Sequence, residues 1–252
     1  MITPALAKYI PETGIILILG RRGSGKSVLA YSILEHLHSK DPEKNLFVYN
    51  FPKPNVLPEF IKPTYNIDFP QNSAVLIDEA YIQFSSRSSM TKKNKIIDML
   101  NGLARQKDLL IIYITQDSTR VDINIIRSAD VLMIKKLSKR QVEFERKEIK
   151  SWLSKIKSAL DSVKDYKKAV YIDCDTDQEY SGIITDCITL PSFWSEDISK
   201  SWGNVCIQPN ANMTKKEEID NKGICKVYNF KNRRYLVLKN GTIKELSREK
   251  TI

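Results

Sequence analysis

The sequence predicts an α/β fold in which a parallel sheet is covered by helices on both faces. Continuous apolar runs such as GIILIL and DLLIIYITQ have the length of buried strands. Segments with apolar residues three and four positions apart, such as KSVLAYSILEHLHS, separate these runs and are typical of helices. The first strand is followed at once by a glycine-rich loop, GRRGSGKS, which is typical of a loop that precedes a helix in such a fold.

Strands and helices alternate along the first two thirds of the chain, as a parallel sheet with crossover helices requires. The expected strands are 14–19, 45–50, 73–80, 108–116 and 130–136, and the expected helices are 26–39, 92–107, 122–128 and 139 to about 163. Residues 51–73 are rich in Pro and Asn and predict an irregular connection.

The pattern changes after about residue 168. Two short strands, AVYIDCD and SGIITDCI, precede the tryptophan-containing stretch PSFWSEDISKSW, and residues 204–222 have the composition of a linker. The stretch YLVLKNGTIKEL predicts a β-hairpin around Asn240-Gly241. We therefore expect a core over 1–168, its C-terminal end with short strands over 169–203, and a small β-rich appendage over 204–252.

Composition narrows the possible partners. The 252 residues are 42% hydrophobic and 28% charged, as in an ordinary globular protein, and the net charge is +10. This charge favours a polyanionic partner, nucleic acid or an anionic membrane, although a solvated lysine-rich surface is the alternative. No apolar run approaches the roughly 20 residues of a membrane span. Four cysteines without a CxxC pair indicate reduced thiols in a cytoplasmic compartment.

The loop GRRGSGKS matches the pattern G-x-x-x-x-G-K-S/T and lies between a predicted strand and a predicted helix, which is the context this pattern requires. Its backbone N–H groups and the positive end of the helix surround phosphates, and Gly23 and Gly25 allow backbone angles that a Cβ would obstruct. Lys26 is expected to reach the β- and γ-phosphates and Ser27 to ligate Mg²⁺. The nucleotide-binding candidates are thus Gly20, Gly23, Ser24, Gly25, Lys26 and Ser27. The alternative is a simple glycine turn before a helix.

Two further strands end on polar residues. Asp78 ends the run AVLID and could hold the Mg²⁺ shell, while Glu79 could act as general base on an attacking water. Gln116 ends YITQ and could sense the γ-phosphate or position the water. The alternatives are that Asp78 and Glu79 cap a following helix and that Gln116 is a polar turn residue.

In the chain, one further strand separates the loop strand from the acidic strand, and the glutamine strand comes next. This order resembles the P-loop ATPases with an additional catalytic glutamate, the RecA-like division. The series GRRGSGKS, VLIDEA, ARQKDLLIIYITQD and INIIRSADVLMIK resembles the HerA–FtsK superfamily of DNA-pumping ATPases over about residues 12–150. It is most similar to the compact members carried by viruses and mobile elements, which include genome-packaging ATPases and Zot-like ATPases.

The resemblance implies a homo-oligomeric ring, commonly a hexamer, with ATP between subunits and double-stranded DNA in the middle. By position, Lys26 and Ser27 match the family's phosphate-loop residues, Asp78 and Glu79 its acids, and Gln116 its strand-end glutamine. An arginine acting on the neighbouring subunit is implied as well, with Arg105 as the first candidate and Arg120 and Arg127 as competitors. A surface or salt-bridged arginine is the alternative for each.

These observations lead to an expected function. It is an ATP-hydrolysing motor that translocates DNA and packages or moves a viral or mobile-element genome, in the host cytoplasm or associated with the virion. A Zot-like extrusion ATPase with a membrane partner and a nucleotide-dependent switch with low turnover are the alternatives; a capsid protein is another possible partner. Four cations, Arg87, Lys92, Lys93 and Lys95, could contact DNA phosphates, or they could belong to a solvated loop.

Overall fold

The computed structural model describes residues 1–49, 51–78, 102, 104, 106–116, 123–145, 147–176 and 179–199, together with three strands between 224 and 246. The chain divides into two compact units, Met1–Gly203 and Asn204–Ile252. The first contains every candidate site residue that the structure describes.

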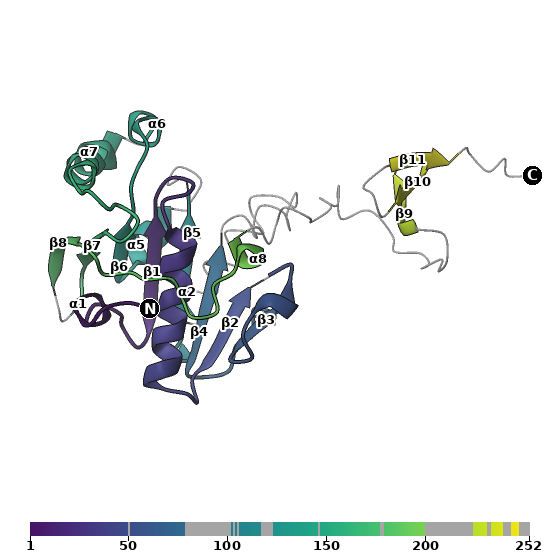
Figure 1. The fold of residues 1–252 in the computed structure, drawn as a ribbon, viewed down its shortest axis with the longest axis horizontal. Helices are drawn as coiled ribbons and strands as arrows, with labels where there is room; N and C mark the ends of the chain where they lie inside the picture. Colours follow the sequence, from purple (N-terminus) through teal and green to yellow (C-terminus); the bar gives the residue numbers. More distant parts are fainter. Residues whose placement is uncertain are drawn as a thin grey trace, which may run out of the picture. The chain divides into compact units, whose positions relative to one another are not determined.

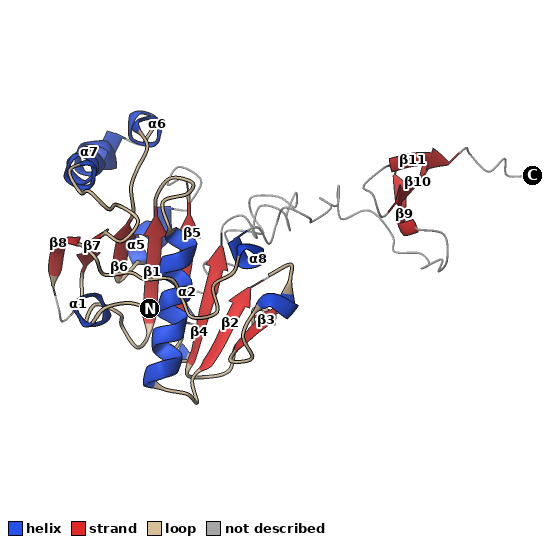
Figure 2. Cartoon of the chain, in the orientation of Figure 1, coloured by secondary structure: helices blue, strands red, loops and turns tan. Residues whose placement is uncertain are grey.

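The first unit is built from strands and helices that alternate along the chain (Figure 1). Its strands are β1 Gly14–Leu19, β2 Asn45–Tyr49, β3 Ile61–Thr64, β4 Ser73–Asp78, β5 Leu110–Thr115, β6 Val131–Ile134, β7 Val170–Cys174 and β8 Tyr180–Ile184. Its helices are α1 Pro4–Ala7, α2 Lys26–Lys40, the 3₁₀ turn η1 Pro54–Val56, α5 Ile123–Ser128, α6 Lys139–Glu143, α7 Lys147–Asp161 and α8 Glu196–Ser199. Figure 2 shows how helices and strands are distributed over the chain.

All eight strands form one sheet in the order β3-β2-β4-β5-β1-β6-β7-β8. The strands from β3 to β6 run parallel, whereas β7 and β8 are antiparallel to their neighbours. The predicted α/β sheet is therefore confirmed, with an antiparallel edge added by the two short strands after residue 168. Parallel strands need crossover segments that return over the faces of the sheet, and such sheets are covered on both sides.

Alternate residues of the central strands are buried on opposite faces of the sheet. In β1, Ile16 and Ile18 pack in the same cluster as α2, whereas Ile15 and Leu17 pack on the other face with β4 and β5. The opposite face also carries α7, whose Leu153, Ile156 and Leu160 are buried. Figure 1 shows α2 in front of the sheet, running alongside β1. This two-sided burial explains why the strand segments are apolar throughout.

The stretch around Trp194 covers the helix that follows the phosphate loop. Tyr31 of α2 meets the rings of Phe193 and Trp194 edge-on, at centroid distances of 6.1 and 6.0 Å. The buried carboxylate of Glu35 in α2 accepts a hydrogen bond from the backbone N–H of Ser192 at 2.8 Å. Residues 192–194 thus pack against α2 and stabilise the helix that begins at the loop.

Two expectations about the first unit are corrected. The segment 51–73 is not irregular throughout, because Ile61–Thr64 forms β3. This strand contains Pro63, which a sheet tolerates at its edge, and β3 is one of the two edge strands of this sheet. The single helix expected from 139 to about 163 is two helices, α6 and α7. The apolar periodicity did not indicate the break between the two helices. Val142 and Leu153 lie about three helical turns apart, so they would also share one face of a single continuous helix.

The second unit contains a three-stranded antiparallel sheet in the order β11-β10-β9. Its strands are β9 Ile224–Phe230, β10 Arg233–Leu238 and β11 Ile243–Leu246. The strands β10 and β11 flank Asn240-Gly241 and pair antiparallel, with Val237 opposite Ile243. The linker expected at 204–222 lies outside the described residues.

Candidate active site

Parallel strands end at a common edge, and this edge gathers the candidate residues. Leu19 at the end of β1 is in register with Thr115 at the end of β5, so that Gly20 and Gln116 follow at the same level. Asp78 ends β4 opposite Ile114 of β5. The glutamine strand β5 therefore lies between the loop strand and the acidic strand, and the described site residues at these three strand ends share one edge.

The loop turns through two glycines with left-handed backbone angles. Gly23 has φ +73°, and a Cβ there would meet nothing within 4 Å, so the backbone angle alone favours glycine. Gly25 has φ +90° and caps α2 without a side-chain hydrogen bond. The first N–H groups of a helix have no intrahelical partner, and Gly25 has no side chain that could accept from them. At the positive end of a helix such groups bind anions.

The beginning of the loop is packed tightly against the segment after β6. A Cβ on Gly20 would lie 2.8 Å from Cβ of Lys135 and 2.9 Å from Oγ of Ser24. Hydrogen bonds extend the β1–β6 pairing into the loop: Lys135 N–H donates to Leu19 at 2.7 Å and Arg21 N–H to Lys136 at 2.9 Å. Glycine at position 20 is required by this close approach.

The side chains of the loop are consistent with a phosphate ligand. Lys26 is 6% exposed, and its Nζ donates to the carbonyl of Arg21 across the loop at 3.0 Å. The hydroxyl oxygen of Ser24 is buried and has no hydrogen-bond partner within the part of the chain that the structure describes. Ser27 is half-buried in the first turn of α2. An uncapped helix start, a lysine folded over the loop and an orphaned hydroxyl together fit a nucleotide's phosphates.

The two arginines inside the loop differ in environment. Arg21 places its guanidinium carbon 5.4 Å from the ring centroid of Tyr166, and Nζ of Lys136 lies 4.6 Å from the same centroid. Contacts of this kind are attractive because the ring face is electronegative. Arg22 is exposed. Arg21 therefore anchors the loop to the turn before β7, a role that the sequence did not indicate.

The remaining candidates lie at different places. Asp78 is half-buried at the end of β4, and Gln116 is exposed at the end of β5. Arg127 is exposed in the last turn of α5, three residues before Asp130, whose carboxylate accepts a hydrogen bond from Ile15 N–H at 2.7 Å. Ile15 belongs to the amino end of β1, so Arg127 is not part of this chain's own phosphate loop. Glu79, Arg105 and Arg120, like the cationic segment 87–95, lie outside the described residues.

A capping box fixes α6 beside the glutamine. The hydroxyl of Ser138 accepts from Gln141 N–H at 3.1 Å, and the Gln141 side chain accepts from Ser138 N–H at 2.8 Å. The amide nitrogen of Gln141 also donates to the backbone carbonyl of Gln116. The pattern S-x-x-Q at 138–141 is visible in the sequence, but its link to Gln116 is not.

A buried lysine behind the loop is the residue that the sequence most clearly missed. Lys135 is fully buried, and its Nζ donates to the carbonyls of Lys167 at 2.7 Å and Ala169 at 2.6 Å. Burial lowers the pKa of Lys135 to about 8, because the charged form loses its hydration. Its position directly after a buried strand, in VLMIKK, is the one sequence signal that could have indicated it.

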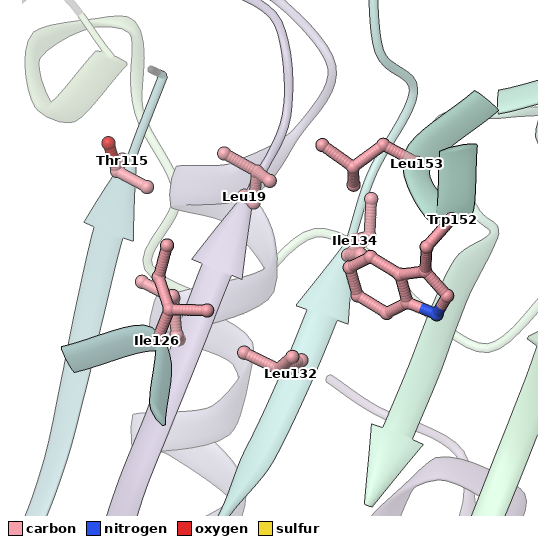
Figure 3. Close-up of a pocket in the computed structure, with 8 residues that line it drawn as sticks. Leu19, Thr115, Ile126, Leu132, Ile134, Trp152 and Leu153 are labelled. Atoms are coloured by element: carbon pink, nitrogen blue, oxygen red, sulfur yellow. The ribbon is translucent and has the colours of Figure 1, made fainter. Parts of the chain in front are cut away.

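An apolar hollow lies on the opposite face from α2, below the same edge (Figure 3). It is lined by Leu17, Leu19, Thr115, Ile126, Leu132, Ile134, Trp152 and Leu153. In Figure 3, Trp152 and Leu153 of α7 approach the ends of β1 and β6. The lining contains no charged group, so the hollow is not a phosphate site.

Within the described part of the chain, no helix has both the length and the apolar character needed to cross a membrane.

Comparison with solved structures identifies the fold. The structure matches the genome packaging NTPase B204 from Sulfolobus turreted icosahedral virus 2 bound to ATPγS, with a TM-score of 0.52 and 16% identity over 71% of this chain and 100% of that chain. The chain is thus an α/β P-loop NTPase in fold.

Two further structures match with lower TM-scores. The DNA-packaging ATPase B204 from Sulfolobus Turreted Icosahedral Virus gives a TM-score of 0.49, with 16% identity over 69% of this chain and 97% of that chain. The pCW3 conjugation coupling protein TcpA gives a TM-score of 0.49, with 13% identity over 75% of this chain and 65% of that chain. No family model and no curated protein sequence matches the chain.

Proposed function

We propose that the protein is an ATPase that translocates double-stranded DNA, in the packaging or transfer of a viral or mobile-element genome. The single observation that carries this proposal is the shared edge of β1, β5 and β4, which joins an uncapped phosphate loop to Gln116 and Asp78. The shared fold with a virus's genome packaging NTPase and the net charge of +10 support the choice of DNA as the substrate.

Each residue has a role in this proposal. The N–H groups at the start of α2 and the Lys26 ammonium bind the phosphates of ATP. Ser27 and Asp78 would hold Mg²⁺, which when bound neutralises charge on the phosphates. Because Mg²⁺ is usually bound by one or two protein side chains together with phosphate oxygens, the nucleotide would supply its other ligands. Glu79 would take a proton from the attacking water, and Gln116 would orient that water.

Assembly is the second part of the proposal. A homo-oligomeric ring would place ATP between subunits and let an arginine of one subunit, Arg105, Arg120 or Arg127, stabilise charge on the phosphoryl group held by the next. DNA phosphates would bind basic residues of the ring without sequence preference, so that DNA binding weakens as salt rises.

The test is ATP turnover by the full chain, measured with and without double-stranded DNA, with particle size determined in the same samples. We expect DNA to raise the rate and the active species to be an oligomer. Lys26→Ala should lower turnover at least about a hundredfold, because charge stabilisation at the phosphates is lost. Lys40→Ala is the matched control: it removes one positive charge from the same helix, at an exposed ion pair with Glu12.

Two results would count against the proposal. Turnover that is indifferent to DNA, together with no DNA binding at low salt, would remove the motor function. Turnover that survives Lys26→Ala unchanged would remove the phosphate loop from the chemistry.

A further inference from the structure

A lysine that takes no part in the proposed chemistry lies directly behind the phosphate loop. The packing of Gly20 against Lys135 brings the two segments into contact. A Cβ built on Gly25, the residue before Lys26, would lie 3.7 Å from Cε and 3.9 Å from Nζ of Lys135. The ammonium of Lys135 is therefore next to the residue that caps α2.

The surroundings of this ammonium are unusual for a buried charge. Its hydrogen bonds go to two neutral carbonyls, at Lys167 and Ala169, in the turn between α7 and β7. No carboxylate forms an ion pair with it within the residues that the structure describes. Buried lysines are ordinarily paired, since an isolated charge loses its hydration without compensation. The positive end of the α2 dipole, at Gly25, makes this location still less favourable for a cation.

A negatively charged ligand on the loop would make this location favourable for the Lys135 ammonium. The phosphates of a nucleotide bind at the start of α2, and their charge would act on Lys135 through a few ångströms of low-dielectric protein. The ammonium would in turn attract the phosphates from behind, without touching them. The acidic groups that act on Lys135 are Asp165 in the α7–β7 turn, which favours the ammonium, and the Cys187 thiol after β8, which does so only when it is ionised. Burial raises the pKa of the Cys187 thiol to about 11, so it stays neutral near pH 8.

We propose that Lys135 is a positioning residue of the nucleotide site, whose buried ammonium supplies positive charge behind the phosphate loop and links nucleotide affinity to its own protonation. This inference rests on the proposed nucleotide binding. Thermodynamic linkage determines in which direction nucleotide affinity changes with pH. Binding of the anion raises the pKa of Lys135, so nucleotide binding takes up a proton between the two pKa values, and affinity falls as pH rises through about 8.

The experiment measures the affinity of the full chain for a fluorescent ATP analogue from pH 7.5 to 9.5, where the phosphates themselves no longer titrate. For the wild type we expect affinity to fall about five- to tenfold over this range. Calorimetry in two buffers of different ionisation enthalpy should show proton uptake on binding near pH 8.5. Lys135→Met should bind more weakly at pH 7.5 and lose the pH dependence, while Lys135→Arg should retain affinity and lose the pH dependence.

Lys44→Met is the matched control. Lys44 is also a buried lysine, and burial lowers its pKa too, but it follows the far end of α2 and donates to Asn72 Oδ1 at 2.7 Å. This variant should keep the wild-type pH profile.

Calorimetry on the wild type tests the role of Lys135 even if a Lys135 variant does not fold. Wild-type affinity that does not change with pH, or binding without proton uptake, would overturn the role of Lys135 and leave the proposed motor function standing. A Lys135→Met protein that folds and keeps the wild-type profile would do the same. A wild type that binds no ATP analogue would overturn both proposals together.

Discussion

At the scale of single residues, the phosphate loop shows how one position can serve packing and another backbone geometry. Gly20 is glycine because Lys135 and Ser24 leave no room for a Cβ, whereas Gly23 has open space and is glycine because of its positive φ. Alanine would therefore fail at each position for a different reason, a collision at the first and a strained backbone at the second. The close approach at Gly20 could not be predicted from the sequence, since Lys135 lies more than a hundred positions away.

Glu79 is the residue on which turnover depends in the proposed mechanism. Glu79→Gln keeps the size and polarity of the side chain but cannot accept a proton from water. We expect turnover to fall by a factor of about 10² to 10⁴, with ATP still bound. Filter binding of labelled ATP, followed by single-turnover hydrolysis, separates the two effects. Glu12→Gln, at an exposed glutamate paired with Lys40, is the control. A Glu79→Gln protein with unchanged turnover would exclude Glu79 as the general base.

At the scale of elements, the sequence predicted what is local and missed what is distant. The strand β1, the loop and α2 are contiguous, and periodicity together with glycine spacing was enough to predict them. The expected strand at 108–116 contains β5, which places Gln116 at the edge. The supports of the loop could not be predicted, because Lys135 meets Lys167 and Arg21 meets Tyr166 only through the folded sheet.

The start of α6 offers a test of one such support. Ser138→Ala removes the hydroxyl that accepts from Gln141 N–H and so opens the capping box beside Gln116. Loss of a cap of this kind costs about 1 kcal/mol. For a domain of this size we expect Tm to fall by about 2–4 °C, as measured by calorimetry or circular dichroism.

Ser158 in α7 provides the comparison for that substitution. Its exposed hydroxyl donates to the carbonyl of Ser154 within the same helix, so Ser158→Ala should change stability by less than about 0.5 kcal/mol. Equal Tm values for the two variants would show that the capping box of α6 does not contribute to stability.

At the scale of the whole molecule, the proposed ring makes each site depend on an arginine from another copy of the chain. Lys26 belongs to the described loop, whereas the exposed Arg127 lies in the last turn of α5, three residues before Asp130, which bonds to the amino end of β1. In the proposed ring, an arginine there would act on a nucleotide held by another copy. Arg105 and Arg120 precede and follow the same strand, β5, in the sequence. The prediction of a ring therefore becomes a prediction about complementation between two inactive proteins.

Lys26→Ala subunits cannot hold a nucleotide productively but still carry every arginine. Subunits with the acting arginine replaced by alanine hold the nucleotide but stimulate no neighbour. When the two are mixed in equal amounts, about a quarter of the interfaces in a randomly assembled ring combine an intact loop with an intact arginine. We expect turnover in the mixture to exceed that of either protein alone, for one of Arg105→Ala, Arg120→Ala and Arg127→Ala. An arginine replaced without loss of turnover is a surface residue. If an inactive arginine variant gains nothing from Lys26→Ala subunits, its arginine acts within its own chain and the shared site between subunits is wrong.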